Sequence, residues 1–63
     1  MIVNGIDIDS DALTIRELID ELDIEPRGIA VAVDTEVVRR SQWDETILSR
    51  QSRVEILTAA AGG

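Results

Sequence analysis

The residues best suited to chemistry are the last three of the chain, Ala61, Gly62 and Gly63. Glycine has no Cβ, so a Gly-Gly end can thread a narrow channel and approach a bound phosphate closely. We therefore expect residues 59–63 to be a flexible tail that presents the Gly63 carboxylate to a partner enzyme for chemical activation. The competing interpretation is an ordinary frayed chain end that has no function.

The remaining composition argues against catalysis by the chain itself. Its 63 residues include no Cys and no His, and all six basic residues are Arg. A thiolate nucleophile, a histidine general base and a Schiff-base lysine are therefore excluded. Asp7, Asp9 and Asp11 alternate, but the glycine and the closing glutamate of an EF-hand loop are missing. We expect a carrier or cosubstrate without a bound metal or cofactor.

The formal net charge of −7 restricts the possible partners. Phosphate contacts need a basic face, so nucleic acid is not an expected partner, and an acidic membrane surface would repel the chain. A basic protein surface would attract it, although the charge could equally serve only to keep a small monomer in solution. No apolar run approaches the ~20 residues of a membrane span and no signal peptide is recognisable, so the cytoplasm is the simplest location.

The elements that must hold the tail begin with a hairpin and a helix. Asn4-Gly5 lies between apolar segments, which predicts strands near 1–4 and 6–9 joined by a tight turn. Thr14 and Glu17 have capping-box spacing, and a helical apolar stripe follows. The residue before a proline disfavours helical dihedral angles, so the helix must end before Pro26.

The sequence pattern predicts three further strands in the second half of the chain. Residues 29–33 alternate between large and small apolar side chains, and 36–38 form a return strand after a turn at Asp34-Thr35. A single helical turn capped by Ser41 and a polar connection at 50–53 precede a last strand at 54–58. We expect that last strand to lie parallel to the first one, in an α+β fold with a mixed sheet of about five strands and one helix on one face.

The sheet face away from the helix is a candidate docking surface. If the strands alternate as expected, this face carries four apolar side chains, those of Ile2, Ala30, Ala32 and Leu57. Ordinary strand residues partly covered by loops are an equally good interpretation. Trp43 is expected to be a packing anchor, and Arg39-Arg40 to be a solvated strand edge or a partner contact.

Six short segments carry a resemblance to a known family: 3–5, 14–19, 26–33, 37–43, 54–56 and 62–63. In this order they resemble the ubiquitin-like β-grasp proteins, and most closely the ThiS family of sulfur carriers in thiamine biosynthesis. The resemblance implies a β-grasp domain at 1–58 and a tail at 59–63. Gly63 would be the residue that is activated, and Gly62 and Ala61 would thread into the partner.

The same resemblance implies a reaction sequence and a set of partners. A ThiF-like adenylating enzyme would use ATP to activate Gly63, and a sulfur donor such as a cysteine desulfurase would supply the sulfur. Thiazole synthase would then take the sulfur from the resulting thiocarboxylate. Three alternatives stay open: a carrier for molybdopterin or another sulfur-containing metabolite, a ubiquitin-like protein modifier, and a plain binding module.

Overall fold

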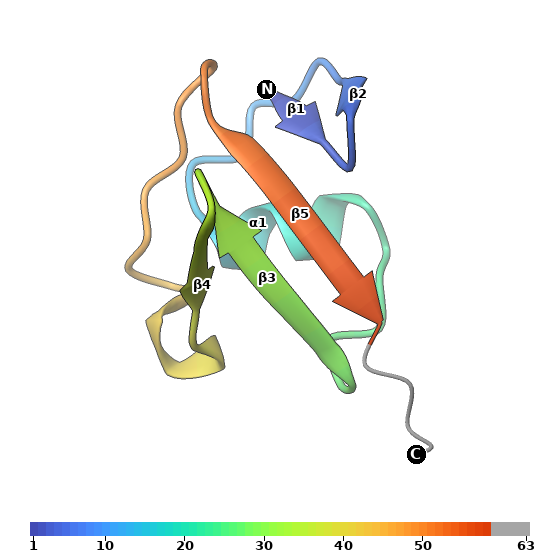
Figure 1. The fold of residues 1–63 in the computed structure, drawn as a ribbon, viewed down its shortest axis with the longest axis vertical. Coiled ribbons are helices and arrows are strands. Elements are labelled where there is room, and N and C mark those ends of the chain that lie inside the picture. The colour runs from blue at the N-terminus through green and yellow to red at the C-terminus, as the bar shows by residue number, and fades with distance from the viewer. Residues whose placement is uncertain (59–63) are drawn as a thin grey trace.

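The structure is a computed structural model and describes residues 1–58. One helix lies behind a single sheet (Figure 1). The elements in chain order are β1 (Ile2–Val3), β2 (Ile6–Asp7), α1 (Ile15–Glu21), β3 (Ile29–Val33), β4 (Glu36–Val38), the 3-10 helix η1 (Arg40–Gln42) and β5 (Arg53–Thr58).

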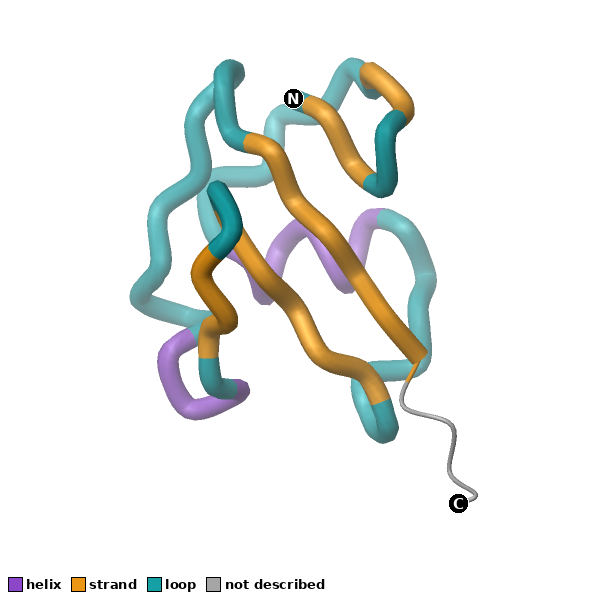
Figure 2. Tube along the Cα trace, in the orientation of Figure 1, coloured by secondary structure: helices purple, strands orange, loops and turns teal. Residues whose placement is uncertain are grey.

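The five strands are arranged in the order β2-β1-β5-β3-β4, so the last strand of the chain is the central one. β1 and β5 are parallel, whereas the other neighbouring pairs are antiparallel. Figure 2 shows the two long strands, β3 and β5, side by side through the middle of the sheet. The predicted α+β class, with a mixed sheet of about five strands and a parallel first and last strand, is confirmed.

Both predicted hairpin turns form, and each places two residues in the left-handed region. Asn4 and Gly5 have φ values of 51° and 82°, and Asp34 and Thr35 have φ values of 50° and 74°. A two-residue turn of this kind matches the right-handed twist of the strands that it joins. Thr35 is unusual, because a β-branched residue rarely adopts positive φ.

Helix α1 begins and ends for identifiable reasons. Thr14 Oγ1 accepts a hydrogen bond from Glu17 N at 3.2 Å, as predicted, but the Glu17 carboxylate accepts from Leu13 N at 3.0 Å, one residue before the expected position. At the other end, Asp23 has φ 56° and Ile24 N donates to Ile19 O at 3.2 Å, the arrangement of a Schellman motif. The helix therefore ends well before Pro26. No helix in residues 1–58 has the length and apolar character of a membrane span.

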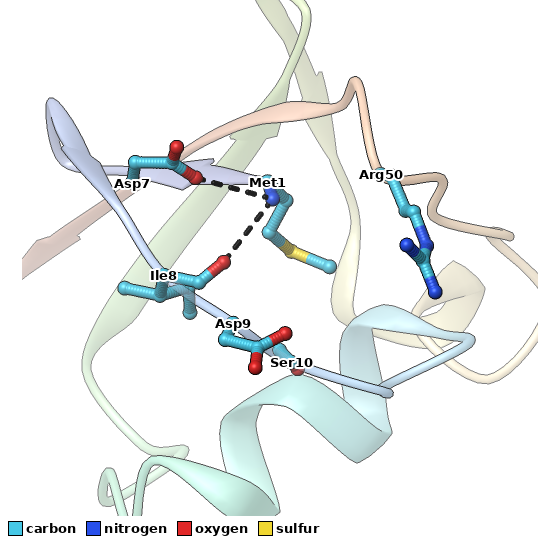
Figure 3. A pocket seen from close by; sticks show the side chains of 6 residues that line it. All are labelled: Met1, Asp7, Ile8, Asp9, Ser10 and Arg50. Atoms are coloured by element: carbon cyan, nitrogen blue, oxygen red, sulfur yellow. Dashed lines mark hydrogen bonds and ion pairs between the residues drawn. The ribbon is translucent and has the colours of Figure 1, made fainter.

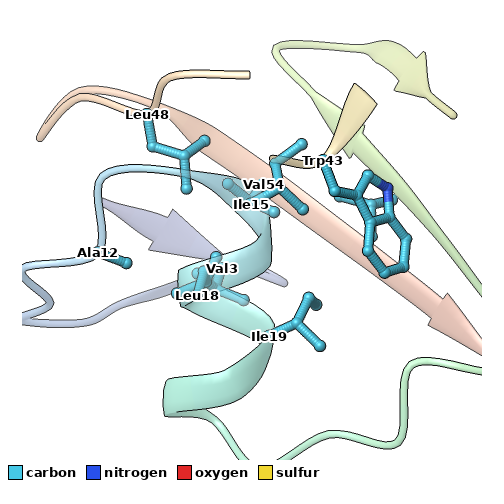
Figure 4. Close-up of a cluster of buried hydrophobic side chains, with 9 residues drawn as sticks. Val3, Ala12, Ile15, Leu18, Ile19, Trp43, Leu48 and Val54 are labelled. Atoms are coloured by element: carbon cyan, nitrogen blue, oxygen red, sulfur yellow. The ribbon is translucent and has the colours of Figure 1, made fainter. Parts of the chain in front are cut away.

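The core lies between α1 and the inner face of the sheet (Figure 4). Three residues of the predicted helical stripe, Ile15, Leu18 and Ile19, are fully buried. They pack with six other buried side chains: Val3, Ala12, Val31, Trp43, Leu48 and Val54. Strands β1, β3 and β5 each supply one of these, so the helix holds the centre of the sheet together.

Two local predictions in the second half of the chain are wrong. Ser41 is not a cap: η1 begins at Arg40, its N-cap is Arg39, and no side chain caps it. Arg53 is not part of the connection, because β5 begins with it and it pairs with Ile2. The Asp34 carboxylate also accepts from Arg53 N at 3.0 Å, which fixes the start of the strand.

Candidate functional site

The predicted site residues Ala61, Gly62 and Gly63 lie outside the described residues. The structure does describe the strand that leads to them. β5 is the central strand of the sheet, with β1 on one side and β3 on the other, and its last residue, Thr58, lies opposite Ile29. The candidate site is therefore the end of β5 together with the sheet surface around it.

β5 is held by hydrogen bonds and core packing at its start and in its middle. Near its start, Asp34 N donates to Arg53 O at 2.8 Å, and Val54 is fully buried in the core. Further along, Ile56 N donates to the Asn4 side-chain oxygen at 2.8 Å, across 52 positions of sequence. These contacts hold β5 in place from Arg53 to Ile56.

Asn4 has two functions that the sequence only partly revealed. Its positive φ belongs to the hairpin turn, which the Asn-Gly signal predicts. Its side chain also replaces a main-chain acceptor of β1, because β1 ends at Val3 while β5 continues. No sequence signal identifies this second function, since it depends on the parallel pairing of strands far apart in the chain.

The outer face of the sheet carries the predicted apolar residues. The strand register places Ile2, Ala30, Ala32 and Leu57 on the face opposite the buried residues Val3, Val31 and Val54. Ala30 lies directly opposite Leu57, whose side chain is 65% exposed. The placement of these side chains agrees with the expected alternation, and their use in docking stays a prediction.

The four predicted docking residues do not form one continuous patch. Ile2 pairs with Arg53, which is four positions from Leu57 in β5, or about 13 Å along the strand. Glu55 lies between them on the same face, opposite Ala32. The contiguous apolar surface is instead formed by Ala30, Leu57, Ala32 and Val37, and we call it the outer patch.

Val37 is the outer-patch member that was not predicted from the sequence. It pairs with Ala32 and is 77% exposed. The alternation of side chains along 36–38 could have predicted it, because Val37 points to the sheet face opposite that of the half-buried Val38.

Trp43 is a packing anchor, as predicted. It is 1% exposed, and its indole Nε1 donates to Val38 O at 3.1 Å. The guanidinium groups of Arg16 and Arg40 lie 5.5 and 5.4 Å from the ring centroid, at cation–π distance. Arg40 also donates to Pro26 O, so this arginine stabilises the fold rather than extending freely into solvent.

A shallow hollow of about 340 Å³ lies beside the N-terminal hairpin (Figure 3). It is lined by Met1, Asp7, Ile8, Asp9, Ser10 and Arg50. Its one hydroxyl group, that of Ser10, already donates to Glu21 at 2.9 Å and accepts from Ala12 N at 3.1 Å. Among residues 1–58 no group of three acidic side chains is arranged to hold a metal ion.

Comparisons with known proteins agree with one another. The ThiS family model matches residues 2–63, a span that includes Gly62 and Gly63. Sulfur carrier protein ThiS of Escherichia coli strain K12 is 32% identical over 50 residues, which make up 79% of this chain and 76% of that protein. The crystal structure of thiamine biosynthesis protein ThiS from Geobacter metallireducens is similar with a TM-score of 0.85 and 29% identity, over 98% of this chain and 96% of that one.

Proposed function

The chain belongs to the ThiS family, and from that membership we propose that it is a sulfur carrier in thiamine biosynthesis that carries the sulfur on its Gly63 carboxylate. The observation that carries the proposal is the family match through residue 63, because it places the Gly-Gly end within the shared sequence. In this function the chain is a cosubstrate of other enzymes and not itself an enzyme.

The proposed chemistry begins with activation of a poor electrophile. The charge and resonance of a carboxylate oppose attack by a nucleophile. A ThiF-like adenylating enzyme therefore joins the Gly63 carboxylate to AMP from ATP and releases pyrophosphate. The acyl-adenylate has a good leaving group, so the partner supplies the activation that this chain has no residues to perform.

Sulfur then replaces one carboxylate oxygen in two steps. A persulfide, formed with a sulfur donor such as a cysteine desulfurase, attacks the acyl-adenylate and displaces AMP. A thiol next reduces the S–S bond of the resulting acyl-persulfide, is itself oxidised to a disulfide, and leaves a thiocarboxylate on Gly63. Thiazole synthase is the proposed acceptor of that sulfur.

The outer patch is the proposed docking surface for these partners. Ala30 and Leu57 are adjacent across β3 and β5, and both lie close to the end of the strand that leads to the tail. An exposed apolar surface near the reactive end suits a partner that must hold the body while it acts on Gly63.

Intact-mass spectrometry tests the proposed function. The chain is incubated with a ThiF-like adenylating enzyme, ATP, a cysteine desulfurase, cysteine and a reducing thiol. We expect the mass to increase by the difference between one sulfur and one oxygen, and we expect no change in a matched chain that lacks Gly63. An unchanged mass for the full chain would refute the proposal, and attachment to lysines of other proteins would indicate a protein modifier.

A further inference from the structure

β1 ends at Val3, which pairs with Val54, so within residues 1–58 no strand pairs with the second half of β5 on the β1 side (Figure 1). We propose that this side, from Ile56 to Thr58, is a strand-addition edge on which an extended segment of the adenylating partner pairs through main-chain hydrogen bonds. The proposal depends on the proposed function only for the existence of that partner. We call these three residues the open edge.

The direction of each main-chain group in β5 follows from the bonds on its two sides. Towards β1, Ser52 O accepts from Ile2 N at 3.0 Å and Val54 O accepts from Asn4 N at 2.9 Å. Towards β3, Arg53 O accepts from Asp34 N at 2.8 Å. Successive residues in a strand point their main-chain groups to opposite sides, so the even-numbered residues of β5 face the β1 side.

The covering of that side stops at Ile56. β1 ends at Val3, and Ile56 N donates to the Asn4 side chain at 2.8 Å. By the alternation, the carbonyl of Ile56 and the N–H of Thr58 also point to the β1 side, where no strand continues. Thr58 and Ile29 are thus a pair without hydrogen bonds between them, and within residues 1–58 no turn, loop or side chain bonds to either free group.

The position of the open edge suits a partner strand. Leu57 and Thr58 are both exposed, so the edge is accessible from the outer face. A free donor and a free acceptor on a strand edge are a template for an added strand, and side chains on the faces then give specificity. Pairing here would fix the end of β5 against the partner.

A second copy of the chain is a poorer occupant than a partner enzyme. Each copy carries a formal net charge of −7, and like charges oppose close approach of two copies. An added strand from the adenylating enzyme would also lie beside the outer patch, because Leu57 belongs to both surfaces.

Amide hydrogen exchange measured by NMR tests the open edge directly. The 15N-labelled chain is compared when free and when bound to the ThiF-like adenylating enzyme. We expect the Thr58 amide to exchange rapidly in the free chain and to be slowed at least about tenfold in the complex. The Ile56 amide, which already has an acceptor, is the internal reference.

A matched pair of variants at one position supplies the second measurement. Thr58→Pro removes the N–H, and a proline is tolerated where the N–H side of a strand is unpaired. Thr58→Val keeps the N–H and changes only the side chain. We expect Thr58→Pro to weaken the Kd for the adenylating enzyme about tenfold, and Thr58→Val to change it by less than about twofold.

The outcomes separate this proposal from the proposed function. A wild-type chain that is never adenylated refutes the proposed function. The chain could instead be adenylated while Thr58 stays unprotected in the complex, or while both variants bind equally well. Either result would refute partner pairing at the open edge and leave the proposed function intact. Protection of Thr58 in the free chain would overturn the proposal: protection that is lost on dilution would assign the edge to a second copy, and protection that persists on dilution would show a bond within the chain. If Thr58→Pro fails to fold, the exchange measurement decides.

Discussion

The Asn4 side chain should stabilise the chain through both its turn conformation and its bond to β5, and three substitutions separate these contributions. Alanine at position 4 would occupy φ 51° at a cost of about 1 kcal/mol and would lose the 2.8 Å bond to Ile56 N, worth about 1 kcal/mol. We therefore expect Asn4→Ala to lower the free energy of unfolding by about 2 kcal/mol. Asn4→Gly tolerates the φ value and should cost about 1 kcal/mol, mainly for the lost bond.

Asn4→Asp is the decisive control, because aspartate tolerates positive φ and keeps an acceptor oxygen. We expect it to change the free energy of unfolding by less than about 0.5 kcal/mol, in spite of its added negative charge. Urea unfolding followed by the fluorescence of Trp43, which is the sole tryptophan and is buried, measures all three variants. If Asn4→Asp is as destabilising as Asn4→Ala, the assigned function of the side-chain oxygen is wrong.

Three further outcomes are expected. Leu57→Glu puts a charge into the outer patch and should weaken binding to the proposed adenylating enzyme at least about tenfold. It should shift the thermal midpoint little, because Leu57 is 65% exposed. Unchanged binding would remove the patch from the proposal. Val54→Ala should lower the free energy of unfolding by about 2–3 kcal/mol in a urea titration, because Val54 is fully buried in the core. Gly28→Ala should cost about 1 kcal/mol by the same measurement, since φ is +77° and only the backbone conformation opposes a Cβ there; a neutral result would contradict that φ.

Much of the fold was accessible from local sequence signals. Asn4-Gly5 predicted the first hairpin, the spacing of Thr14 and Glu17 predicted the helix start, and alternation along 29–33 gave β3 with its observed bounds. Each of these signals acts over a few residues, and tertiary packing reinforces all of them. The predicted directions of Ala30 and Leu57 followed from the same alternation.

The features that the sequence did not reveal depend on contacts between distant segments. Arg53 joins β5 because Ile2 pairs with it, and no local property of a polar stretch indicates this. The gap between Ile2 and the outer patch depends on the register of β1 against β5. The N-cap of η1 is Arg39 instead of Ser41. Trp43 follows η1, and its indole ring is held by Val38 O and by two arginine side chains from other positions in the chain.

The position of β5 also determines when the chain can fold. β5 is the last strand to be synthesised, yet it is the one that β1 and β3 both need as a neighbour. Before it is present, the hairpins β1–β2 and β3–β4 share no strand that could join them into one sheet. The parallel pairing of β1 with β5 closes a loop of about 50 residues, which makes the entropic barrier to folding large for so short a chain. Assembly should therefore be a late and concerted event, governed by the strand that also leads to the proposed site of activation.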